Sequence, residues 1–255
     1  MDLLQHNRMA WDQEVADGNG ATIPVSHQEV VQAVETGRFT IQIGSKALPS
    51  EWLDDICGKD VLCLASGGGQ QAPLFAAAGA KVTLLDNSPA QLQRDEEVAR
   101  NHHLKIELVL GDMRDLSAFA PGTFDMVFNA FSNCYVDDVL CVWRECYRVL
   151  RKGGCLISTF WNPINYLFDY VAWERDGTLR PAYAIPYSGL TSLPKEQVEQ
   201  HIADHWAIEF GHSLQHQIGG QIDAGFAIIG YLESRFDNDI LTPYMDTIVT
   251  TRARK

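Results

Sequence analysis

Residues 61–71, VLCLASGGGQQ, join a short apolar run to three consecutive glycines. The run at 60–65 predicts a buried strand, and residues 71–79 (QAPLFAAAG) predict a helix that ends at Gly79. Glycine lets a ligand approach the backbone closely because no side chain stands in the way. A glycine cluster alone is also consistent with an ordinary turn, so the rest of the chain must decide between the two.

Strands and helices alternate regularly after this loop. Further strands are expected at 81–86, 106–112, 124–130 and 155–160, with helices at 88–100 and 137–150. Two more strands, at 227–234 and 244–253, resemble a hairpin that closes the sheet. The pattern predicts an α/β fold with a doubly wound, mostly parallel, seven-stranded, Rossmann-like sheet and a C-terminal antiparallel strand. Ligands of such sheets bind outside the carboxyl ends of the strands.

The sequence divides into four parts on this interpretation. Residues 161–211 interrupt the alternation with many aromatic residues and prolines, and they are too long for a simple loop. The predicted parts are an N-terminal helical leader at 1–58, a ligand-binding core at 59–160, an inserted cap over the site at 161–211, and a C-terminal helix with strands at 212–255.

Composition restricts the class of partner. The 255 residues carry a net charge of −13 and no cluster of Lys and Arg, which disfavours nucleic acids and anionic membranes as partners. No apolar run approaches the ~18 residues of a membrane span, and the polar N-terminus has no signal-peptide core. We therefore expect a cytoplasmic protein, and the sequence leaves its oligomeric state open.

Two adenosine-containing ligands suit a glycine loop in this position: a nicotinamide dinucleotide and S-adenosylmethionine (SAM). Both need a carboxylate after the second strand for the ribose hydroxyls, and Asp86 lies there. Ala72 stands where a dinucleotide motif has its third glycine. Asp112 and Met113, after the third strand, suit the edge and the face of an adenine ring. These features favour SAM over the dinucleotide.

Five segments in order resemble the successive motifs of class I SAM-dependent methyltransferases. They are VLCLASGGGQ (61–70), VTLLDNSPAQL (82–92), GDMRDL (111–116), FDMVFNAFSN (124–133) and YRVLRKGGCLIST (147–159). The pattern is most similar to the small-molecule branch that includes the ubiquinone and menaquinone biosynthesis enzymes. The similarity is tight over about 55–160 and looser through the final strands.

The resemblance implies a set of SAM-binding residues. Ala65, Ser66, Gly67 and Gly69 would surround the methionine part, Asp86 and Asn87 the ribose, and Asp112 and Met113 the adenine, with Asn129 facing the methionine end. The chain departs from the family pattern at two positions. Cys63 stands where the family usually has an acidic residue, and Ala65 where it usually has glycine.

The acceptor is expected beyond the fourth and fifth strands, under the cap. Its candidate contacts are Asn133, Tyr135, Tyr166 and Tyr187, and His212 is the candidate general base. Two His pairs stand four residues apart, His201 with His205 and His212 with His216. They lack the Glu and the third ligand of a zinc motif, so we expect no metal site.

The favoured function is methyl transfer from SAM to a small-molecule acceptor by in-line displacement. This reaction depends on alignment of two reactants, so no catalytic triad is expected. A non-catalytic SAM-binding regulator is the alternative that Cys63 and the lack of an obvious base leave open. A nicotinamide-dependent oxidoreductase is a third, less favoured interpretation.

Overall fold

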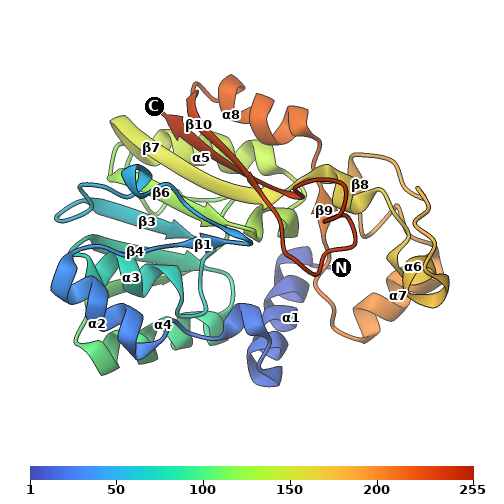
Figure 1. Ribbon diagram of the computed structural model, residues 1–255, viewed down its shortest axis with the longest axis horizontal. Coiled ribbons are helices and arrows are strands. Elements are labelled where there is room, and N and C mark those ends of the chain that lie inside the picture. The colour runs from blue at the N-terminus through green and yellow to red at the C-terminus, as the bar shows by residue number, and fades with distance from the viewer.

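A seven-stranded sheet forms the centre of the computed structural model, which describes residues 1–255 (Figure 1). Its strands run in the order β10-β11-β7-β6-β3-β4-β5. All neighbours are parallel except β11, which is antiparallel to both β10 and β7. The bounds are β3 Asp60–Leu64, β4 Lys81–Asp86, β5 Ile106–Leu110, β6 Phe124–Ala130, β7 Leu150–Trp161, β10 Ala227–Ser234 and β11 Ile248–Arg254. The predicted fold class is confirmed.

Helices cover both faces of this sheet. The principal ones are α1 Leu3–Asp17, α2 His27–Thr36, α3 Gln71–Ala77, α4 Pro89–His102, α5 Val139–Val149 and α8 Gly220–Asp223, the last preceded by a π-helical turn at Gln215–Gly219. Ser26 and Glu29 form a capping box at the start of α2, and Ser88 caps α4 ahead of Pro89. These local signals explain why the helices begin where the sequence predicts.

Two apolar clusters join the helices to the sheet. On one face, Phe75 of α3 packs with Phe128 of β6 and with Ile43 and Trp52 from the N-terminal segment. On the other face, Trp143 of α5 is the largest side chain of a buried cluster that includes Leu62 and Leu156 of the sheet. The N-terminal segment is therefore part of the core. Besides helices, it contains a short hairpin, β1 Gln42–Ile43 with β2 Lys46–Ala47.

The strand order reverses between β3 and β6, because β4 and β5 extend the sheet in one direction and β7 extends it in the other. The connections after β3 and β6 diverge there and leave a crevice at the carboxyl edge. The last strand begins at Ile248, later than the predicted start at residue 244. The residues before Ile248 form turns in which Asp239 accepts hydrogen bonds from the Leu241 N–H and the Thr247 hydroxyl.

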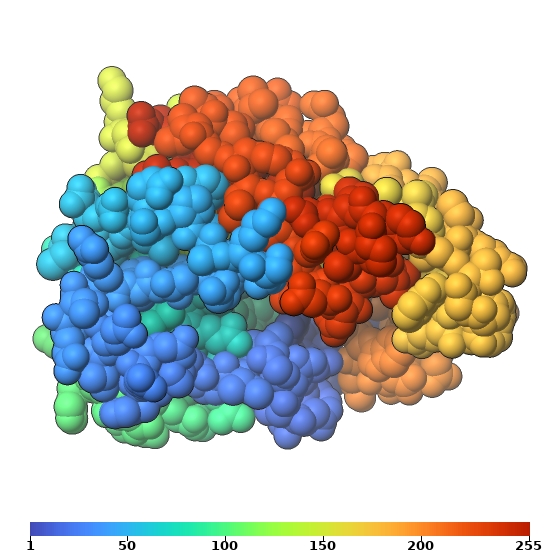
Figure 2. Space-filling view, in the orientation of Figure 1, coloured from blue at the N-terminus to red at the C-terminus, as the bar shows by residue number.

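Residues 161–211 project beyond this edge, at the right of Figure 1. They contain a short 3₁₀ turn at Pro163–Tyr166, the helices α6 Tyr170–Asp176 and α7 Lys195–Ala203, and the ribbon of β8 Tyr187–Ser188 with β9 Phe210–Gly211. Another 3₁₀ turn, at Ser132–Tyr135, follows β6 in the core. In the space-filling view the red segment before β11 fills the space between the sheet and this projection (Figure 2). None of the helices combines the length and the apolar character needed to cross a membrane.

Candidate functional site

Two cavities adjoin at the carboxyl edge of the sheet. The first cavity, of about 380 Å³, lies between the glycine loop, the ends of β4 and β6, and α1. The second cavity, of about 920 Å³, lies under residues 161–211. Tyr135, Trp161 and Phe236 belong to the walls of both, so the cavities share a boundary. Both volumes fall within the range typical of small-molecule sites.

Neighbouring protein atoms explain the three glycines of the loop. A Cβ at Gly67 would lie 2.7 Å from the Cβ of Gln91, and one at Gly69 would lie 2.9 Å from a Pro24 carbon. Gly68 and Gly69 also have φ angles of +110° and +76°, which glycine adopts readily. Only Gly67 of the three lines the first cavity; Gly69, one of the predicted ligands, packs against the protein.

Two carboxylates bind the amide groups of this loop. The N–H of Gly67 donates to Asp86 Oδ2 at 2.9 Å, and those of Gly68 and Gly69 donate to Asp95 Oδ2 at 2.9 and 2.8 Å. Burial raises the pKa of Asp95 to about 8, against the lowering effect of these N–H donors. Sequence reasoning missed Asp95, which lies on the buried face of α4.

Ala65 begins the loop with a φ of +47°, a left-handed conformation that is unfavourable for a residue with a Cβ. Class I SAM-dependent methyltransferases usually have glycine at this position. Ala65 adopts the left-handed backbone conformation that glycine adopts readily. Cys63, the other departure, is fully buried within β3, and burial holds the pKa of its thiol well above the usual value.

Asp86 and Asn87, at the end of β4, both line the first cavity. The second oxygen of Asp86 accepts from the Ser88 N–H at 2.9 Å, and burial raises the pKa of this carboxyl group. Asn87 is tied to α1, because its amide donates to the Leu4 carbonyl and its oxygen accepts from Arg8. The N-terminal helix is thereby fastened over the cavity.

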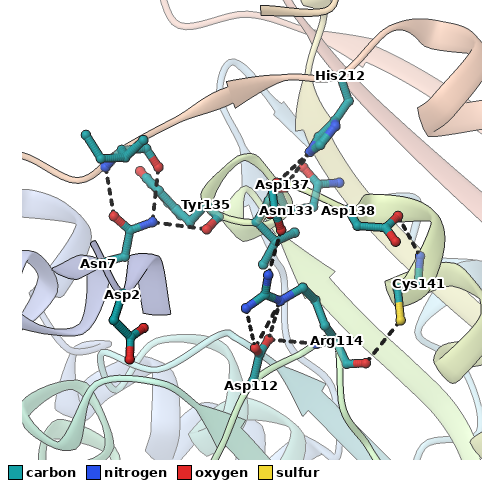
Figure 3. A network of polar contacts seen from close by, with 12 residues as sticks. Asp2, Asn7, Asp112, Arg114, Asn133, Tyr135, Asp137, Asp138, Cys141 and His212 are labelled. Atoms are coloured by element: carbon teal, nitrogen blue, oxygen red, sulfur yellow. Dashed lines mark hydrogen bonds and ion pairs between the residues drawn. The ribbon is translucent and has the colours of Figure 1, made fainter. Parts of the chain in front are cut away.

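Asp112 and Met113 line the same cavity beyond β5. Arg114 pairs with Asp112, at 2.7 Å from Nη2 to Oδ2, and with Asp137, at 2.6 Å from Nη1 to Oδ1 (Figure 3). These ion pairs fix the Asp112 carboxylate at the cavity wall. Ala65, Ser66, Gly67, Asp86, Asn87, Asp112 and Met113 are thus brought together as the sequence predicts.

Asn129 and Asn133 do not line either cavity. The Asn129 amide is buried and donates to the Leu64 carbonyl and to Ser132 Oγ, and Ser132 itself lies in the first wall. Asn133 is buried and exchanges hydrogen bonds with Gln217. Asn129 therefore holds the end of β3 and Ser132 in place, and Asn133 holds Gln217; neither amide faces a cavity.

His212 is placed differently from the expected general base. Its Nε2 lies 2.9 Å from the Val136 carbonyl and 3.2 Å from the Asn133 carbonyl, and the ring is buried outside both cavities (Figure 3). Burial lowers its pKa. We correct the prediction, because a ring held against two carbonyl groups does not face a molecule in either cavity.

The predicted tyrosines do meet in the second cavity, and they meet around a residue that was missed. Tyr166 and Tyr187 stack with ring centroids 5.3 Å apart, and the Tyr166 hydroxyl donates to Glu209 Oε2 at 2.8 Å. Tyr135 lies on the shared boundary. The only signal for Glu209 in the sequence is an acidic residue between apolar neighbours, Ile208 and Phe210.

The walls contain other residues that the sequence did not indicate. Those in the first wall come from α1, from the turn after β6 and from the segment before β11: Leu3, Leu4, Asn7, Trp11, Phe131 and Phe236. No group of three or more His, Cys, Asp and Glu side chains is arranged to hold a metal ion.

The first cavity fits an adenosine ligand in its chemistry. Carboxylates at the ends of β4 and β5 stand beside apolar Met113, and the loop after β3 exposes backbone at Gly67. These are the groups that ribose hydroxyls, an adenine ring and an amino acid tail require.

Comparison with known proteins agrees with this chemistry. Residues 62–158 match the family model described as a methyltransferase domain. A Bacillus subtilis protein named as an uncharacterized methyltransferase, YbaJ, is 45% identical over 99% of this chain and 98% of its own length. A ubiquinone biosynthesis O-methyltransferase from Pseudomonas aeruginosa is 35% identical over 48% of this chain and 55% of its own length.

Solved structures show the same fold at low sequence identity. A SAM-dependent methyltransferase from Mesorhizobium loti superimposes with a TM-score of 0.59 at 20% identity, covering 80% of this chain and 94% of that protein. The near full-length relative shows the family: the chain belongs to the methyltransferases, and it has the fold of SAM-dependent members of that class.

Proposed function

We propose that the protein transfers the methyl group of SAM to a small molecule that binds in the second cavity. The observation that carries the proposal is the shared boundary of the two cavities at Tyr135, Trp161 and Phe236. A cofactor in the first cavity and an acceptor in the second would meet there without crossing the protein.

The proposed arrangement of SAM follows the chemistry of the first wall. Asp86 takes the ribose hydroxyls, because its carboxylate lines the cavity and its two oxygens, which accept the Gly67 and Ser88 N–H groups, have further lone pairs. Asp112 and Met113 take the adenine ring, with Arg114 keeping the carboxylate in position. Ala65 and Gly67 border the methionine part.

The chain contributes alignment and the exclusion of water. SAM supplies a methyl group that its sulfonium already activates, and we propose that the acceptor displaces it in line. Phe131, Trp161 and Phe236 pack against one another at the boundary, with ring centroids 5.1 to 6.0 Å apart. Alignment of two reactants in a closed apolar site accounts for a large share of the rate of such reactions.

Substitutions in the second cavity test the proposal. Acceptors are screened by the release of S-adenosylhomocysteine, and Tyr166→Ala and Tyr187→Ala are then compared with Tyr231→Ala, an exposed tyrosine on β10. We expect the first two to weaken acceptor binding about tenfold, while SAM affinity measured by calorimetry stays within about twofold. An equal loss of SAM affinity in a folded variant would contradict the assignment of the second cavity.

A further inference from the structure

Glu209 occupies a rigid position in the wall of the second cavity. It directly precedes β9, between the buried residues Ile208 and Phe210. Asn7 of α1 binds both backbone groups of Ile208, accepting from its N–H at 2.8 Å and donating to its carbonyl at 3.0 Å (Figure 3). The Glu209 carbonyl accepts from the Gly189 N–H at 2.8 Å, so its backbone is held on both sides.

The carboxylate of Glu209 has only neutral hydrogen-bond donors. The Tyr166 hydroxyl donates to it at 2.8 Å, and a hydrogen bond from Tyr135 also stabilises its charged form. It takes part in none of the ion pairs, unlike Glu145, whose pKa Arg148 lowers. Burial is the largest effect on Glu209 and raises its pKa. A carboxylate that has no cationic partner and faces a largely aromatic wall indicates a ligand group that carries a hydrogen.

The rest of the wall disfavours a negatively charged ligand. Besides Glu209, the wall contains ten Phe, Trp and Tyr side chains and three carboxylates, and it contains no Lys or Arg. Asp169 caps α6 and Asp239 binds a turn, so these two serve the fold. The titratable groups that face Glu209 or share its wall are Cys134, Tyr135, Tyr166, Asp169, Tyr170, Glu174, Tyr183, Tyr187, His201 and Asp239.

We infer that the acceptor is a largely apolar molecule without negative charge, that its nucleophilic nitrogen or oxygen carries a hydrogen, and that Glu209 receives this proton. The inference rests on the proposed function and specifies its substrate class. As the lone pair of the acceptor forms the new bond to the methyl carbon, the carbon–sulfur bond breaks and its electrons remain on sulfur. The proton that the acceptor loses is transferred to a Glu209 oxygen.

The surroundings of Glu209 suit this role. A general base is most effective when its pKa lies near the working pH. Burial raises the pKa of the Glu209 carboxyl group toward that range. The Tyr166 hydroxyl orients the carboxylate, and the stacked Tyr187 ring holds Tyr166 in place. Aromatic faces also attract a cationic amine before it loses its proton.

Three probes of similar size test the substrate class: 2-phenylethylamine, 4-ethylphenol and 3-phenylpropanoate. Binding is followed by fluorescence of the wall residues Trp161, Trp173 and Trp206, in the presence of S-adenosylhomocysteine. We expect the amine or the phenol to bind at least about tenfold more tightly than the carboxylate. Tighter binding of 2-phenylethylamine indicates a nitrogen acceptor, and tighter binding of 4-ethylphenol indicates an oxygen acceptor. Equal or tighter binding of the carboxylate, or no binding of the other two, overturns the inference.

Matched variants test the proton transfer with the acceptor that the release assay identifies. Glu209→Gln should lower kcat about a hundredfold, and Glu209→Asp should retain an intermediate rate. SAM affinity and thermal stability serve as controls for folding. Glu196→Gln makes the same change at an exposed position of α7 that lines neither cavity, and it should leave kcat unchanged.

The two levels of the proposal fail in different ways. If Tyr187→Ala weakens acceptor binding but Glu209→Gln matches Glu196→Gln in kcat and pH profile, the second cavity is the acceptor site and the role of Glu209 is wrong. If neither tyrosine variant alters acceptor binding, the second cavity itself is wrongly assigned.

Discussion

In the first cavity the carboxylates are bound by the chain itself, whereas in the second cavity Glu209 faces the open space with only tyrosine hydroxyls as partners. Asp86 accepts two backbone N–H groups, and Asp112 pairs with Arg114. Binding and folding therefore depend on the same groups in the first cavity. In the second they are separate, so substitutions there are expected to alter catalysis with little effect on stability.

Asp86→Ala should produce the largest effect, because it removes a ligand contact and a structural acceptor together. Loss of charge-assisted hydrogen bonds to the ribose, worth ~1.5–3 kcal/mol, should weaken SAM by about ten- to a hundredfold. The N–H groups of Gly67 and Ser88 also lose their acceptor, so the free energy of unfolding should fall by about 1–3 kcal/mol.

Calorimetry with SAM and urea unfolding measure the two effects of this change, and Asp86→Asn is the control that retains an acceptor oxygen. Normal SAM affinity in a folded Asp86→Ala protein would place the ribose elsewhere. Normal stability would mean that the glycine loop does not depend on the Asp86 carboxylate. It would then be wrong that binding and folding share the same groups in the first cavity.

Asp95→Asn should stabilise the protein at alkaline pH. The pKa of Asp95 is raised from its usual 3.8 to about 8, so the folded state binds more protons than the unfolded state between these values. Stability then falls as the pH rises through this range, by about 1–3 kcal/mol after allowance for relaxation. The amide variant cannot ionise, and because Oδ2 accepts both loop N–H groups while Oδ1 has no partner, little bonding is lost.

Thermal melting of the Asp95 variant at pH 5 and pH 8 measures this effect. The control is Asp125→Asn. Burial by itself would raise the pKa of Asp125, but the hydrogen bonds that it accepts from the Asp60 N–H and from Arg151 together outweigh burial and lower the pKa. That change should destabilise the protein at both pH values. A melting temperature of the Asp95 variant that follows the wild type at both pH values would contradict the buried-charge argument.

Gly211→Ala should impair the second cavity alone. A Cβ at this position would lie 2.5 Å from the Tyr166 ring, which must then move away from Glu209. We expect kcat/KM for the acceptor to fall about tenfold, with SAM affinity unchanged. Gly20→Ala is the matched control, since nothing lies within 4 Å of its Cβ position. Equal effects of the two variants would show that Tyr166 is not a positioning residue.

Ala65→Gly should have the smallest effect. The left-handed φ of Ala65 costs about 1–2 kcal/mol, while the added freedom of glycine in the unfolded chain costs about 0.5–1 kcal/mol. We expect a gain in stability below about 1 kcal/mol by urea unfolding. Gly69→Ala is the opposite change and should destabilise, because its Cβ would lie 2.9 Å from Pro24. A clear loss of stability in Ala65→Gly would mean that its methyl group packs in an essential contact.

The sequence by itself determined the strand-end residues of the first cavity, although it did not indicate the wall residues that α1 and the segment before β11 contribute. Ala65, Asp86 and Asp112 each follow a strand of a regular α/β pattern, and parallel strands bring their carboxyl ends to one edge. Helix caps such as Ser88 involve residues only a few positions apart, so the start of a helix such as α4 could also be predicted from the sequence. Local pattern and the geometry of parallel strands are enough to bring these strand-end residues together.

Only the tertiary structure decided the surroundings of Glu209 and the partners of the glycine loop, although the sequence had indicated Tyr135, Tyr166 and Tyr187. Asn7, Asp95 and Glu209 come from three distant segments, and no periodic pattern relates them. The role of His212 was misjudged for the same reason, because its neighbours are carbonyl groups from a turn 76 and 79 residues away in sequence. Long-range packing determines which polar groups face a cavity and which are bound by the backbone, and a local sequence pattern does not record that choice.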